Sequence, residues 1–180
     1  MDKPALTRLL DYHYWANRQL WRPVMALSEA QFTQPVSDTS PSLRTLLVRM
    51  VANENLWVNY LWHGDVEFLQ EAQLPTRASI RAEWDALEEE IRDFVDELSP
   101  AALQRQVQPV FLSAGTSLRV WEILLQIIND ATACRAQLRL HLHQLGSPAP
   151  AHEFLDFLVD PAGRRRIVDD LQQDLPYPQG

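Results

Sequence analysis

The stretch Thr116–Leu145, TSLRVWEILLQIINDATACRAQLRLHLHQL, decides the fold of this chain. Its apolar residues recur at intervals of three and four, which is the spacing of one face of an α-helix. Gly146 follows it as a stop signal, and Pro148 lies just beyond. We therefore predict a long helix that begins near Thr116 or Ser117 and ends at Leu145.

The same apolar spacing predicts three further long helices, over about 4–27, 41–63 and 76–98. Loops are expected at 34–40 and up to Pro75. Between the long helices, short helical turns are expected after Ser28 and after Ser99-Pro100, a small hairpin over 107–115, and a short helix over 152–158. Without β–α alternation, these elements predict an all-α four-helix bundle. We expect residues 1–160 to form the bundle and 161–180 to be a partly helical tail.

Composition narrows the class of protein. At 180 residues, with 46% hydrophobic residues, the chain suits one globular domain. A net charge of −8 disfavours nucleic acid as a partner, and Arg164-Arg165-Arg166 is interpreted as a solvated helix face. The single cysteine, Cys134, excludes an intramolecular disulfide. No signal-like or membrane-spanning segment is recognised, so a cytoplasmic location without a membrane partner is expected.

Polar residues within the apolar stripes are the candidates for chemistry, because the standard catalytic signatures are absent. In the last long helix, Asp130 and Cys134 share a face with Ile127 one turn apart. Arg49, in the apolar run 46–61, is the candidate partner for that carboxylate. Three interpretations stay open: an Arg49–Asp130 ion pair with Cys134 as a small hydrophobe, a pocket for a small anionic or thiol ligand anchored by Arg49, and a metal site using Asp130 and Cys134.

Other polar residues carry less weight. His141 and His143 are two apart on a helix and therefore cannot chelate together, and His13 is interpreted as a packing residue. The run Glu88-Glu89-Glu90 is expected to be solvated, with weak i,i+4 pairs to arginine. The tryptophans Trp15, Trp57 and Trp121 are expected in the core. No catalytic residue is assigned.

Several segments together resemble the DinB (DNA-damage-inducible) family in order and spacing. They are Tyr14-Trp15-Ala16-Asn17, Ser42-Leu43-Arg44-Thr45-Leu46 leading to Trp57, and Asn129–Leu138, followed by Leu145-Gly146 and Glu153–Leu158. The resemblance implies an up-down-down-up bundle, often a homodimer, in which three histidines of many members bind a divalent metal such as zinc or nickel. On this chain the three histidine positions map to Arg49, Asp130 and Cys134.

The resemblance therefore implies a family member in which all three metal-binding histidines are replaced, and we expect no metal and no other cofactor. Three functions are compatible with it: a DinB-like protein of unassigned activity that binds a small molecule in the bundle, with a stress-related role suggested by the family name; a metal- or thiol-dependent transferase or hydrolase with a non-standard site; and a dimeric structural or interaction protein.

Overall fold

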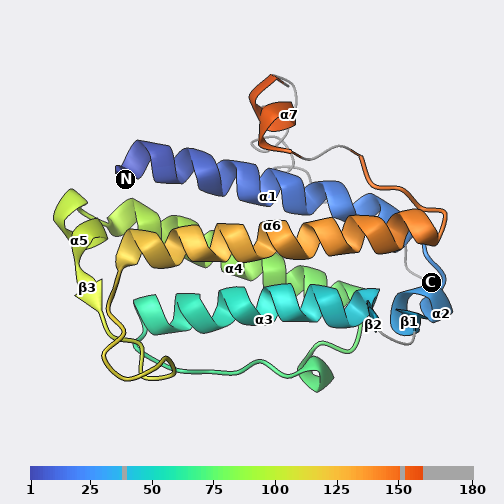
Figure 1. Cartoon of the computed structure of the whole chain (residues 1–180), viewed down its shortest axis with the longest axis horizontal. Coiled ribbons are helices and arrows are strands. Elements are labelled where there is room, and N and C mark those ends of the chain that lie inside the picture. Colours follow the sequence, from blue (N-terminus) through green and yellow to red (C-terminus); the bar gives the residue numbers. More distant parts are fainter. Residues whose placement is uncertain (38–39, 151–152, 160–180) are drawn as a thin grey trace.

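Four long helices run through the part of the chain that the computed structural model describes, residues 1–37, 40–150 and 153–159. They are α1 (Lys3–Met25), α3 (Leu43–Trp62), α4 (Arg77–Glu97) and α6 (Val120–Gln144). In Figure 1, α3 and α4 run in one direction and α1 and α6 in the other, which is the up-down-down-up order. The predicted all-α bundle is confirmed.

The helix starts follow from side-chain caps. Ser42 accepts a hydrogen bond from the Thr45 N–H, so α3 begins two residues later than the Ser40-Pro41 signal suggested. Thr76 caps α4 in the same way through the Ser79 N–H. At the other end of α3, Gly64 adopts a φ of 77°, a left-handed conformation that ends a helix and favours glycine.

The connections contain more structure than expected. The predicted loop at 34–40 contains β1 (Pro35–Ser37), which pairs antiparallel with β2 (Ser40–Ser42). The predicted hairpin exists, but its strands are β3 (Gln106–Val107) and β4 (Leu118–Arg119), so 108–112 is not a strand. This pairing also delays α6 to Val120, because Leu118 and Arg119 are held in the ladder. The remaining short elements are α2 (Glu29–Thr33), η1 (Glu71–Gln73), α5 (Pro100–Gln104) and α7 (Phe154–Val159).

The core lies between the four long helices. Helix α6 packs against both α1 and α3, and α4 packs against α3 and α1. Trp15 and Trp57 are buried as expected, and Trp121 is half-buried. Outside the main core, α7 packs its Phe157 against Tyr12 and Trp15 of α1. The predicted tail over 161–180 lies outside the described residues, and within the described part no helix is long and apolar enough to cross a membrane.

Candidate functional site

The structure brings Arg49 and Cys134 together, as their positions in the sequence suggested. Arg49 lies on α3, and its Nη2 donates hydrogen bonds to Cys134 Sγ at 3.2 Å and to Gln137 Oε1 at 2.9 Å, both on α6. Cys134 is only 2% exposed, whereas the Arg49 side chain lies on the surface. The guanidinium therefore covers the thiol and separates it from solvent.

Asp130 does not join this contact. Its side chain is half-exposed, and no ion pair between it and Arg49 is present in the described chain. The buried face of α6 is centred on Ile127, Ala131 and Cys134, so the carboxylate lies at its edge and reaches solvent. The predicted Arg49–Asp130 ion pair is thus replaced by a contact between Arg49 and Cys134.

Replacing Arg49 with methionine should therefore change the free energy of unfolding by less than about 1 kcal/mol, because no buried carboxylate loses its partner. Chemical denaturation of the wild-type and variant proteins measures this difference. A loss of several kcal/mol would show that Asp130 depends on Arg49 after all.

A second group of polar side chains is buried in the centre of the bundle, around Glu54 of α3. Glu54 is 2% exposed. Its carboxylate accepts hydrogen bonds from the Tyr14 hydroxyl at 2.5 Å and from Trp84 Nε1 at 3.2 Å, and lies 3.4 Å from His13 Nε2. Helices α1, α3 and α4 therefore meet at one carboxylate.

Arg135 of α6 completes this buried network and is 1% exposed. Its Nη1 donates to Asn17 Oδ1 at 2.8 Å and to His13 Nδ1 at 3.3 Å, and its Nη2 donates to Thr132 Oγ1 at 2.7 Å. Because a guanidinium only donates, we assign the His13 proton to Nε2, which faces Glu54. His13 thus links a buried cation to a buried carboxylate, and all four long helices contribute to the network.

Burial shifts two pKa values in this network. The pKa of the Tyr14 hydroxyl is raised well above its ordinary value, first by burial and then by the neighbouring Glu54 carboxylate. The pKa of Arg135 is lowered by burial, which interactions with Tyr12 and Glu54 partly oppose. Tyr14 therefore remains a hydrogen-bond donor to Glu54 over the whole neutral range.

Comparisons with known proteins agree with this geometry. The model of the DinB family matches residues 1–165. The chain belongs to the DinB family. Among solved structures, a DinB-like protein from Bacillus subtilis, YjoA, is similar in fold, with a TM-score of 0.60 and 14% sequence identity over 82% of this chain and 96% of that one. A search of curated proteins finds no match.

The residues at the histidine positions of this DinB protein do not suit a divalent metal. Arg49 cannot ligate a cation, because its guanidinium stays protonated and carries only donors. Cys134 already accepts a hydrogen bond from it. Asp130 and Cys134 supply at most two ligands, and the described residues contain no group of three His, Cys, Asp or Glu side chains that could hold a metal ion.

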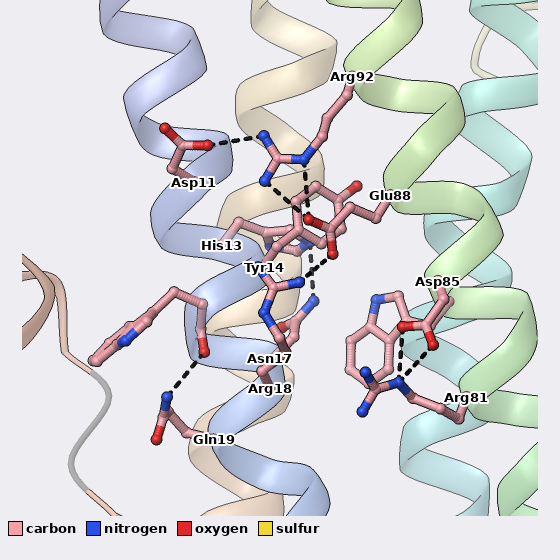
Figure 2. Close-up of polar contacts among 12 residues, drawn as sticks. Asp11, His13, Tyr14, Asn17, Arg18, Gln19, Arg81, Asp85, Glu88 and Arg92 are labelled. Carbon is pink, nitrogen blue, oxygen red and sulfur yellow. Dashed lines mark hydrogen bonds and ion pairs between the residues drawn. The ribbon is translucent and has the colours of Figure 1, made fainter. Parts of the chain in front are cut away.

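Helices α1 and α4 of the DinB bundle are joined by a chain of charges, shown in Figure 2. Arg92 donates to Asp11 at 2.8 Å and pairs with Glu88, which also accepts from Arg18 at 2.5 Å. Glu88 is only 5% exposed, so the expectation that the whole run Glu88-Glu89-Glu90 is solvated is wrong at its first residue. This face of α4 turns toward α1, where two arginines neutralise the carboxylate.

The buried network was missed by the sequence analysis, although a signal for Glu54 existed. Glu54 follows Met50 and Val51 and precedes Val58 at the three-and-four spacing of the buried stripe of α3, so it is a lone carboxylate on an apolar face. Of the histidines, His13 is fully buried in the network and His141 is buried, whereas His63 and His143 are exposed; His152 lies outside the described residues.

A cavity of about 390 Å³ opens on the other side of α3, between α3, α4 and the connection that joins them. Asn55 and Asn59 of α3 form one wall. The carboxylates come from the connection and α4, and the lining is completed by Glu67, Leu69, Gln73, Leu74, Glu83, Ala86, Leu87 and Glu90. This volume lies within the range of small-molecule sites. The cavity does not include the predicted Arg49 site.

Proposed function

We propose that this DinB-family protein binds a small molecule and does so without the divalent metal that the family resemblance implies for many members. The observation that carries the metal-free part is the Arg49 guanidinium, which lies 3.2 Å from the Cys134 thiol. A fixed positive charge beside a prospective ligand atom repels a metal ion and removes one of its three ligands.

The cavity between α3 and α4 supports the small-molecule part of the proposal. It combines apolar side chains such as Leu69 and Leu87 with a few polar groups, including the buried Asn55. Apolar walls with a small number of placed polar groups are typical of ligand sites. The proposed binding position is therefore this cavity rather than the surface around Arg49.

A thiol-dependent transferase is less well supported by the geometry. Its nucleophile would have to be Cys134, because the chain has no other cysteine. That thiol is only 2% exposed and is covered by Arg49. A substrate could not reach it without displacing α3 from α6.

Elemental analysis tests the metal-free part. The purified, tag-free protein is incubated with zinc, nickel and manganese, desalted and analysed, and we expect no metal above background. The positive control is the triple variant Arg49→His, Asp130→His and Cys134→His, which restores three imidazoles at the family positions and should retain close to one metal ion per chain.

Stoichiometric metal in the wild-type protein that is lost on changing Asp130 and Cys134 to alanine would contradict the proposal and favour the enzyme with a non-standard site. The expected homodimer, the cytoplasmic location and the stress-related role rest on the sequence and the family resemblance, and they stay predictions. Sedimentation equilibrium measures the first of them directly.

A further inference from the structure

The cavity between α3 and α4 is strongly acidic. Glu67, Glu83 and Glu90 line it, and its lining includes no lysine, arginine or histidine. The pKa of Glu83 is raised by partial burial and by the nearby charges of Glu90 and Glu67. Mutual repulsion among these carboxylates costs stability unless a positive charge lies between them.

Asn55 provides an independent indication of a ligand. Its side chain is 4% exposed and lines the cavity, and its Oδ1 accepts a hydrogen bond from Asn59 Nδ2. Among the described residues, Asn55 Nδ2 has no hydrogen-bond partner. A buried amide N–H that faces a cavity calls for an acceptor atom there.

The positions of the carboxylates define the length of the molecule that would satisfy them. Glu83 and Glu90 are seven residues apart on α4, which places them on one face roughly 10 Å apart along the helix axis. Ala86 and Leu87 lie between them in the cavity lining. This arrangement suits two cationic groups joined by an aliphatic chain better than it suits a single metal ion.

We infer that the cavity binds a linear aliphatic polyamine in an N-acylated form, with ammonium groups at Glu83 and Glu90 and the acyl oxygen at Asn55. The hydrocarbon segments of such a molecule would lie against Leu69, Leu74 and Leu87. The inference rests on the proposed small-molecule function and adds the chemical class of the ligand.

The test is isothermal titration calorimetry of the full chain with N1-acetylspermidine in low salt at pH 7. The double variant Glu83→Gln/Glu90→Gln should weaken binding at least tenfold, because both ammonium groups lose their counter-charges. The matched control is Glu89→Gln/Glu97→Gln, which removes the same charge from exposed positions of α4 outside the cavity. This control should change the affinity less than twofold.

Binding should also weaken between pH 7 and pH 5. Protonation of Glu83, whose pKa is raised, competes with the ligand. The charged groups that face it are Glu67 of the connection and Glu90 of α4, while α3 contributes the uncharged Asn55 and Asn59. A tighter complex at pH 5 would contradict the inference.

Three results would overturn the inference. They are no binding of N1-acetylspermidine, equal weakening by the two double variants, which would indicate general attraction to the net charge of −8, and equal binding of the uncharged 1,8-octanediol. In the last case the small-molecule function would stand and only the cationic class would fail. A metal found by the elemental analysis would instead contradict the proposed function itself.

Discussion

Replacing Glu54 with alanine is expected to lower the free energy of unfolding by about 3–5 kcal/mol, the largest effect of any single change considered. The substitution leaves the Tyr14 hydroxyl and Trp84 Nε1 without their acceptor in a dry interior. It also leaves the charge of Arg135 buried without the carboxylate that balances it through His13. Urea denaturation followed by tryptophan fluorescence and circular dichroism measures the loss.

The matched control is Glu89→Ala, which removes the same side chain from an exposed position of α4 and should change stability by no more than about 0.5 kcal/mol. Combining Glu54→Leu with Arg135→Met removes both charges and should cost less than the sum of the two single changes. A loss below about 1 kcal/mol for Glu54→Ala would mean that the network does not stabilise the fold.

Above about pH 10, the ordinary pKa of tyrosine, the protein should lose about 1.4 kcal/mol of stability per pH unit because of Tyr14 alone. In the folded state the pKa of Tyr14 is raised, so its proton is retained, while the unfolded chain releases it. The stabilisation is therefore complete below the unfolded pKa and is lost as the pH rises toward the folded pKa. Denaturation midpoints between pH 8 and pH 12 measure this slope.

The variant Tyr14→Phe should remove this part of the slope, at the cost of about 1 kcal/mol at neutral pH from the lost hydrogen bond. Tyr60→Phe, which changes a half-buried ring packed against Trp57 and Phe111, should keep the wild-type slope. The comparison is clean because the chain has one lysine, Lys3, so few amino groups titrate in this range. An unchanged slope in Tyr14→Phe would show that its hydroxyl ionises freely in the folded state.

The helices could be predicted because their signals are local. Apolar residues at three-and-four spacing and stop signals such as Gly64 act within a few residues of chain, and all four long helices were placed to within a few residues of their ends. The small β-pairs could not be predicted in the same way. Pairing Gln106 with Arg119 depends on how α5 and α6 bring those segments together.

The candidate site was predictable only in part. The contact between Arg49 and Cys134 agrees with their predicted proximity, but the role of Asp130 depends on where the edge of the buried face of α6 falls. An apolar stripe defines that edge only to within about one residue. Glu54 and Arg135 were overlooked because charged side chains are common on helices, and only the packing of four helices shows that these two are inside.

The buried network has a consequence for how this protein can diverge. Glu54 depends on donors from α1 and α4, and Arg135 depends on acceptors from α1, so the four long helices are bound to one another's identities. We expect these positions to drift only in concerted steps. Arg49 and Asp130, which reach the surface, are free to change one at a time. Loss of a metal from this bundle is therefore a short evolutionary path, whereas exchange of its internal charges is a long one.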